Sequence, residues 1–152
     1  MSLEFNTIGV KIGYVVETTA GSRPTSGVTN IPDVKTIPGI DLNPSKLQVT
    51  NLIDKYQRYI AGVLDAGDDI GLLANLTASL KTMWGSLVSA ANTAWASQKS
   101  TWFEISIPGF DSFWFAGIPT PLGFNEMGVD AVAEATLHII PNQIVGWATA
   151  AS

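Results

Sequence analysis

The stretch "IGLLANLTASLKTMWGSLVSAANTAWASQKSTWFEISIPG", residues 70–109, changes its apolar period twice. Residues 70–77 alternate between two sides, as a β-strand does. Residues 78–97 then place apolar side chains at i, i+3, i+4 and i+7, which predicts an amphipathic helix roughly 28 Å long with Thr77 as its N-cap. Residues 100–109 alternate again. The stretch therefore predicts one long helix between two strands.

Outside this stretch the sequence predicts strands without a second helix. Alternation or extended character is found at residues 10–17, 33–38, 46–51, 111–119 and 129–140. We expect Pro141 to end the last strand, because proline cannot donate to a β-ladder. One helix among so many strands predicts a mainly β domain over residues 1–152. It would be a β-sandwich or barrel of about six to eight mostly antiparallel strands with the helix packed against it.

Composition indicates a chain whose surface is partly covered by a partner. Charged residues make up 14% of the 152 residues, and the formal net charge is −5. Typical globular proteins have roughly 25% charged residues. An acidic chain without a basic run is a poor nucleic-acid binder, because affinity for phosphate depends on Lys and Arg. Apolar residues make up 46%, including five Trp, which favours burial against another subunit. No apolar run is long enough for a transmembrane helix.

The sequence lacks the residue sets that catalysis or metal binding requires. It has no cysteine, and its one histidine, His138, is expected to be a polar residue on the exposed face of a strand. No nucleotide-binding loop occurs. Residues 65–69, "DAGDD", lack the ligand spacing of an EF-hand and are expected to form a solvated turn. We therefore expect no enzyme activity, no cofactor and no metal.

A second stretch, "NLIDKYQRYIAGVLDAGDDIG" (residues 51–71), gathers charged and aromatic side chains without any catalytic partner. Tyr and Arg are typical of interface hot spots, so we interpret residues 53–66 as an inter-subunit arm and residues 68–71 as its return into the sheet. Further aromatic residues are too many for one small core, and some of them are expected to be interface anchors. This group comprises Trp102, Phe110, Phe113, Trp114, Phe115, Phe124 and Trp147.

The order of these pieces resembles the major tail tube proteins of long-tailed bacteriophages over nearly the whole chain. The resemblance is carried by "YVVETTAGSRP" (residues 14–24), by the run from Thr50 to Gly67, by "IPG" (107–109) and by "MGVDAVAEATLHI" (127–139). It implies a β-sandwich with one flanking helix, subunits that join as six-membered rings, and rings that stack into a tube.

The resemblance also implies partners and a location. The partners would be further copies of the chain, the tape-measure protein inside the tube, the tail terminator, and distal tail or baseplate proteins. DNA would only pass through, and no membrane span is implied. The protein would be part of the virion tail and would assemble in the bacterial host cytoplasm.

Two groups of site residues follow from the resemblance. A long loop bridges stacked rings in this family, and here it corresponds to about residues 51–67. The candidate inter-subunit or ring-stacking residues are Asp54, Lys55, Tyr56, Gln57, Arg58, Tyr59 and Ile60. The sequence leaves open whether Tyr56, Arg58 and Tyr59 touch the next ring or the neighbour in the same ring. Asp130 and Glu134, on one face of the last predicted strand, are candidates to line an acidic channel that repels DNA phosphates.

Two other interpretations stay open at this point. The chain could be the inner-tube protein of a contractile tail or of a type VI-like secretion machine, because these share the fold. It could also be a small β-sandwich that binds carbohydrate through exposed Trp102 or Trp114.

Overall fold

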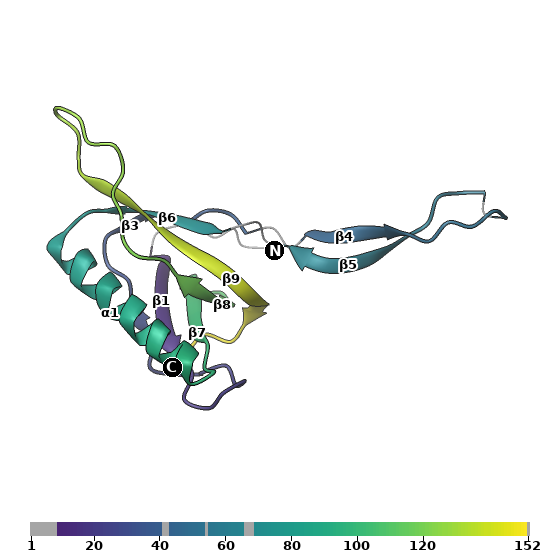
Figure 1. Ribbon diagram of the computed structural model, residues 1–152, viewed down its shortest axis with the longest axis horizontal. Coiled ribbons are helices and arrows are strands. Elements are labelled where there is room, and N and C mark those ends of the chain that lie inside the picture. Colours follow the sequence, from purple (N-terminus) through teal and green to yellow (C-terminus); the bar gives the residue numbers. More distant parts are fainter. Residues whose placement is uncertain (1–8, 41–42, 54, 66–68, 152) are drawn as a thin grey trace.

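The computed structural model describes residues 9–40, 43–53, 55–65 and 69–151. Its main feature is a seven-stranded sheet with the order β2-β1-β7-β8-β9-β6-β3, in which all neighbours are antiparallel (Figure 1). Strands β4 and β5 pair separately with each other. The strands are β1 (Lys11–Val16), β2 (Thr29–Asn30), β3 (Val34–Thr36), β4 (Asn43–Gln48), β5 (Tyr59–Asp65), β6 (Ile70–Asn75), β7 (Thr101–Ser106), β8 (Ser112–Pro119) and β9 (Glu134–Ala148).

The predicted helix is α1 (Ala78–Ala96), which packs along the open side of the curled sheet (Figure 1). Thr77 caps it as expected, because its Oγ1 accepts a hydrogen bond from the Leu80 amide at 3.1 Å. The buried side chains of the helix recur every three or four residues and are Leu80, Trp84, Leu87, Ala91 and Ala94. The expected mainly β fold with one flanking helix is therefore confirmed.

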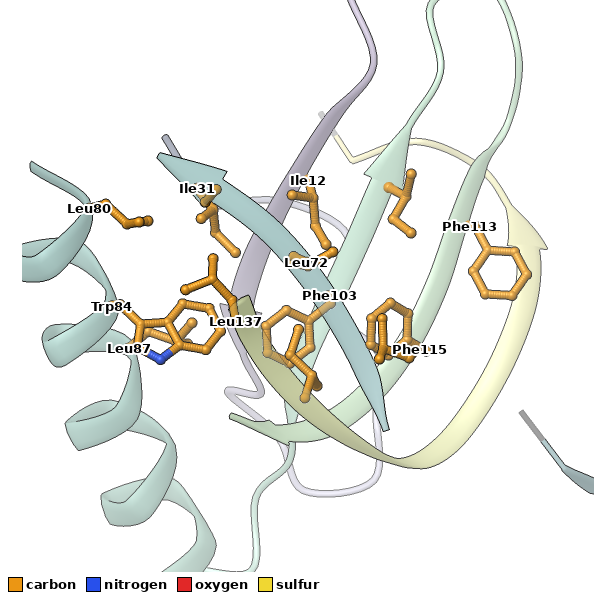
Figure 2. Packing of buried hydrophobic residues seen from close by; sticks show 14 residues of the cluster. Ile12, Ile31, Leu72, Leu80, Trp84, Leu87, Phe103, Phe113, Phe115 and Leu137 are labelled. Carbon is orange, nitrogen blue, oxygen red and sulfur yellow. The ribbon is translucent and has the colours of Figure 1, made fainter. Parts of the chain in front are cut away.

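The main core lies inside the curl of the sheet (Figure 2). Leu72 of β6 and Leu137 of β9 face Ile12 of β1 and Phe103 of β7 across it, and each of the four is at most 2% exposed. Strand alternation places these residues on one face, as the sequence predicts. From the helix side, the Trp84 indole N–H donates to the Thr120 carbonyl at 2.7 Å and ties α1 to the segment after β8.

A second, smaller cluster occupies the opposite face of the sheet. It contains Trp102, Trp114 and Ala116, all of them buried. Trp102 donates its indole N–H to Glu17 at 2.8 Å, and Trp114 donates to the Thr149 carbonyl at 3.1 Å. The middle strands of the sheet are thus covered on both faces. Because both Trp side chains are buried, the interpretation as a carbohydrate-binding module that uses Trp102 or Trp114 is wrong.

Glu17 is the polar centre of this second face. Besides Trp102, its carboxylate accepts hydrogen bonds from the amides of Ser100 at 3.0 Å and Gly21 at 3.1 Å. Burial by itself raises the pKa of Glu17, but these hydrogen bonds and the nearby Lys99 charge outweigh it and leave the pKa below its ordinary value. The ionised carboxylate therefore fastens the loop after β1 to the start of β7.

The last strand differs from its prediction at both ends. β9 begins at Glu134 rather than near residue 129, because Asp130 lies in a turn with a φ of 60°. It also continues through Pro141 to Ala148. Pro141 is tolerated because it lies opposite Gly117, next to an irregularity in the β8–β9 register, and bulges are positions where a strand accepts proline.

Candidate assembly surfaces

The first candidate surface is the β4–β5 hairpin, which we call the arm (residues 43–53 and 55–65). It extends away from the sheet and the helix (Figure 1). The backbone register pairs Asn43 with Asp65 and Gln48 with Tyr59. The prediction of a loop over about residues 51–67 is therefore wrong in its second half, where Tyr59–Asp65 is a strand. The cause is pairing with β4, a contact between segments that the local pattern of residues 51–67 does not reveal.

Backbone and side-chain hydrogen bonds hold the backbone of the arm tip. The Val49 amide donates to the Arg58 carbonyl at 2.9 Å, and the Arg58 amide donates to Thr50 Oγ1 at 2.8 Å. Asn51 Oδ1 accepts a hydrogen bond from the Ile53 amide at 3.1 Å. These bonds satisfy backbone groups, so the tip keeps a defined shape while its apolar side chains stay outside.

The apolar side chains of the arm are exposed. Leu52 is 105% exposed, Ile53 89% and Tyr56 81%. Leu47 and Tyr59 are each 51% exposed further along the arm. A two-stranded hairpin has no core of its own and is marginally stable in water, so such a group of solvated apolar side chains indicates a contact surface.

The arm tip gathers most of the predicted inter-subunit residues. Lys55, Tyr56, Gln57 and Arg58 follow one another there, Tyr59 comes next as the first residue of β5, and each is exposed. The Tyr59 hydroxyl donates to Gln57 Oε1 at 2.7 Å. Asp54 lies outside the described residues. The backbone of Ile60 pairs with that of Leu47.

The second candidate surface is an apolar groove of about 480 Å³ at one end of the sheet. We call it the end groove. It is lined chiefly by Ile37, Ile40, Ile105, Ile107, Phe113 and Trp147. Trp147 is 53% exposed and forms edge-to-face contacts with Phe113 and with Phe110, which is 48% exposed.

Burial divides the seven aromatic residues, some of which were expected to be interface anchors, into two groups. Trp102, Phe113, Trp114 and Phe115 are buried and belong to the cores, whereas Phe110, Phe124 and Trp147 are exposed. Sequence reasoning did not single out Ile37 and Ile40 as site residues. Their signal was a pair of isoleucines around Pro38 and Gly39, a non-helical apolar segment that leads directly to the arm.

A third feature is the edge of the sheet along the second half of β9. β6 pairs with β9 from Glu134 to Ile139, and β8 pairs with it from Ile139 to Ala148. Within the described residues, the side of β9 opposite β8 has no strand beyond Ile139. Ile140, Val145 and Trp147 are exposed along this part. An unpaired strand edge with apolar side chains is a typical place for another chain to add.

The predicted channel-lining pair does not share a strand face. Asp130 is in the turn before β9, and Glu134 is the first residue of the strand. Glu134 forms an ion pair with Lys35 at 3.0 Å, so part of its negative charge is compensated locally. The premise of a shared face is wrong, and a channel-facing position of either residue stays a prediction.

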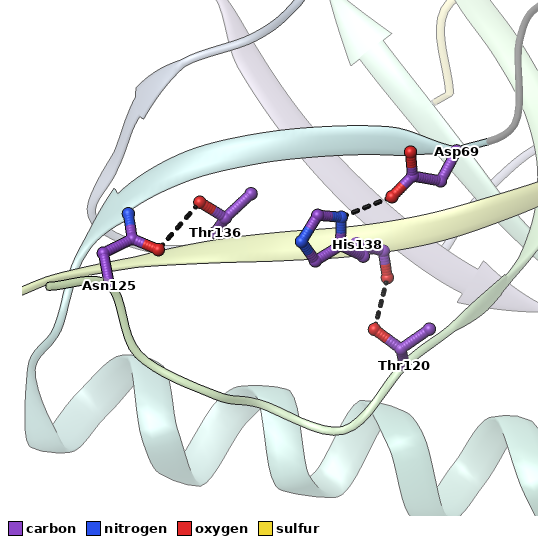
Figure 3. Close-up of polar contacts among 5 residues, drawn as sticks. All are labelled: Asp69, Thr120, Asn125, Thr136 and His138. Carbon is purple, nitrogen blue, oxygen red and sulfur yellow. Dashed lines mark hydrogen bonds and ion pairs between the residues drawn. The ribbon is translucent and has the colours of Figure 1, made fainter.

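Polar contacts fasten the connection before β9 to the exposed side of the sheet (Figure 3). His138 contacts the Asp69 carboxylate, and Thr120 donates its hydroxyl to the His138 carbonyl at 3.2 Å. Thr136 donates to Asn125 at 3.0 Å. His138 is therefore an exposed strand residue, as predicted.

Metal-ligating side chains are dispersed in the part of the chain that the structure describes. In those residues no three His, Asp or Glu side chains come together in a way that could hold a metal ion. Over the same residues, no helix is both long and apolar enough to span a bilayer. The distinctive surfaces of the described residues are thus the arm, the end groove and the β9 edge.

Comparison with known proteins places the fold. No protein-family model and no curated protein matches the chain. Among solved structures, a chain of the anti-feeding prophage baseplate, 6-fold symmetrised, matches with a TM-score of 0.62 and 9% identity, over 95% of both chains. A chain of the virion of a native gene transfer agent particle matches with a TM-score of 0.61 and 12% identity, over 96% of this chain and 100% of the other.

A third match has the same character. It is a chain of the tail of an empty gene transfer agent particle with C6 symmetry, with a TM-score of 0.60 and 13% identity, over 97% of this chain and 100% of the other. At identities this low, the structural matches establish a shared fold and nothing more. The chain therefore has the fold of subunits found in tail and baseplate particles, and the predicted tail-tube-like fold is confirmed.

Proposed function

We propose that the chain is a structural subunit of a phage-tail-like particle, and that its copies close into rings that stack into the tail tube. One observation carries the proposal: the chain has a tail-particle fold over at least 95% of its length and also carries an arm whose apolar side chains are solvated. Two of the matching particles are described with six-fold symmetry, which supports rings of six copies.

The physical argument for rings rests on two unlike surfaces on one chain. An arm on one side and a receptive edge or groove elsewhere make a heterologous contact, which closes into a ring or continues as a filament. The arm is the first kind of surface, and the end groove with the adjoining β9 edge is the second. Apolar surface at both would leave water on assembly, and that burial is the main driving force for association.

The remaining roles follow from the tube itself. The tube would enclose the tape-measure protein, join the tail terminator and distal tail or baseplate proteins, and conduct DNA without binding it. The formal charge of −5 per chain supports passage over binding, because an acidic wall repels phosphates. Asp130, which is exposed, is a better candidate for that wall than the ion-paired Glu134. The proposed role is structural and involves no catalysis.

Negative-stain electron microscopy of the purified chain tests the proposal. We expect rings and, at higher concentration, tubes. A preparation that stays monomeric at every concentration, both alone and with other tail proteins, would contradict it.

An arm-tip replacement tests the role of the tip in stacking. Removing residues 54–61 would cut into β5, so the better variant replaces residues 50–57 with Asn-Gly. This two-residue turn can join Val49 to Arg58, whose backbones already pair. The variant should fold and fail to form long tubes. Tubes of unchanged length would contradict a role of the tip in stacking.

A second candidate role is a ring of the baseplate, at the end of a tube. It is favoured by the match to a chain of the anti-feeding prophage baseplate. A baseplate ring should stop at one or a few layers in the micrographs, whereas a tube protein should polymerise further. The inner tube of a contractile tail would also polymerise, and it would bind a sheath protein in a co-sedimentation experiment.

A further inference from the structure

The structure contains two apolar surfaces, one projecting and one concave, that do not contact each other. The arm tip presents Leu52, Ile53 and Tyr56 to solvent, each at least 81% exposed. The end groove is a concave apolar surface of about 480 Å³, within the size range of pockets that bind ligands. A projecting apolar group and an apolar hollow on one chain are the two halves of a knob-and-hole contact.

We propose that the end groove receives the arm tip of a second copy of this chain. The inference rests on the proposed function and adds to it the receptor for the arm. Leu52 and Ile53 would enter between Ile107 and Trp147, and Tyr56 would pack at the rim with its hydroxyl kept in water. Tyr suits a rim position, because one end of its side chain is apolar and the other forms hydrogen bonds.

The occupant has to come from another copy. The arm leads away from the rest of the chain, and its tip lies far from the sheet (Figure 1). The groove, by contrast, is lined by residues 37–40, directly before the arm, and by β7, β8 and β9. With about 3.3 Å per residue, the ten or so residues from the root of the arm to its tip span roughly 30 Å, enough to reach a neighbouring subunit.

Charge supports the same occupant. Residues 43–65 contain Lys46, Lys55 and Arg58 against Asp54 and Asp65, a formal charge of +1. Since the whole chain carries −5, the remainder carries −6. The arm is thus the basic part of an acidic protein, and it is attracted to the body of another copy rather than to another arm.

Another apolar pocket is less suitable for the tip. This second pocket, of about 410 Å³, lies between α1 and residues 121–123. Lys81 lines it, so an arm with a formal charge of +1 would meet a like charge there. The end groove is lined by uncharged residues. The chemistry of the two surfaces therefore favours the end groove.

Disulfide trapping tests this contact directly, because the chain has no cysteine of its own. The test variant combines Leu52→Cys with Gly39→Cys. Leu52 is fully exposed, and a Cβ added at Gly39, on the groove wall, meets no atom within 4 Å. The control variant combines Leu52→Cys with Gly85→Cys, another position where an added Cβ meets no atom within 4 Å, on the wall of the second pocket.

Both variants are assembled, oxidised and run on a non-reducing gel, and the same samples are viewed by negative-stain microscopy. We expect the Leu52–Gly39 variant to lose its monomer band to a ladder of linked subunits, and the control to stay monomeric on the gel. Rings or tubes without the ladder, or an equal ladder from the control, would overturn the inference and leave the proposed function standing. Monomers in every micrograph and on every gel would overturn both.

Discussion

Replacing Leu52 and Ile53 with serine separates folding from assembly. The two side chains are 105% and 89% exposed, so neither adds packing to the folded subunit. Exposed substitutions away from special backbone positions change stability by about 0.5 kcal/mol or less. We therefore expect the free subunit of the double variant to unfold at nearly the same temperature as the parent chain.

Assembly should respond quite differently. If both side chains become buried in a neighbouring subunit, each contributes about 1.5–3 kcal/mol relative to exposure to water. The double variant would then lose about 3–6 kcal/mol per contact. Since 1.4 kcal/mol corresponds to a factor of ten, the contact would weaken by roughly a hundredfold to ten-thousandfold.

Analytical ultracentrifugation over a range of protein concentrations measures this loss as a rise in the concentration at which rings or tubes first form. The matched control is Leu52→Met with Ile53→Val, which keeps the tip apolar and should assemble like the parent. Assembly of the serine variant at the parental concentration would refute the assignment of the tip. A fall in its free energy of unfolding by more than about 1 kcal/mol would refute the claim that the tip is unpacked in the subunit.

Three further predictions concern the subunit alone. Glu17→Gln should lower the free energy of unfolding at pH 7 by about 2–4 kcal/mol, because a carboxylate that accepts three hydrogen bonds becomes an amide that cannot accept them all. The folded-state pKa of Glu17 is lowered, so its stabilisation is present above the ordinary glutamate pKa of about 4.3 and disappears as pH falls through the folded value. The gap between Glu17→Gln and the parent should therefore close on acidification below about pH 4, and a gap of constant size would contradict this account. Thr77→Ala should cost about 1 kcal/mol in urea unfolding through loss of the helix cap, whereas Thr82→Ala, at an exposed position in the same helix, should cost nothing. Gly117→Ala should destabilise the subunit by about 1–3 kcal/mol, because the added Cβ would approach the Ile140 carbonyl oxygen to 2.9 Å. The control Gly85→Ala, where the space is open, should stabilise it by up to about 1 kcal/mol. Equal effects of the two changes in thermal unfolding would be inconsistent with the packing at Gly117.

The sequence predicts a helix or strand correctly where the element buries one side and exposes the other, because its apolar period then matches its burial. The helix has an apolar side and a solvated side, and its ends were predicted to within a residue. The strand β6 alternates between the core and a half-buried side, as its residues do. In these segments local periodicity and tertiary burial agree, so the pattern is sufficient.

Prediction was less successful where burial does not follow a single face. β8 is buried on both sides, as its near-continuous apolar run "SFWFA" reflects, and the second cluster with Glu17 was therefore missed. Residues 129–133 alternate like a strand yet precede one, because the turn at Asp130 comes before pairing with β6 begins. Strand β5 depends on its partner β4, a contact that no local pattern of residues 51–67 contains.

That the arm-tip residues contact another subunit stays a prediction. The sequence indicates their grouping but not their geometry. Clustered Tyr, Lys and Arg without catalytic partners indicated a contact surface, and these residues do follow one another at the arm tip. The end groove combines residues from four separate parts of the chain, between Ile37 and Trp147. Such a surface exists only after the sheet has curled, so sequence spacing carries no direct sign of it.

The strand β9 has a mechanical consequence for a subunit under load. Its first half is bonded to β6 and its second half to β8, with Ile139 paired on both sides. A force that pulls along β9 would load both ladders in shear, so that the hydrogen bonds within each ladder would be strained together. The strand thus connects the β6 side of the sheet to the β8 side and can transmit tension between them. In any assembly of such subunits, tension along β9 would be shared between the two ladders.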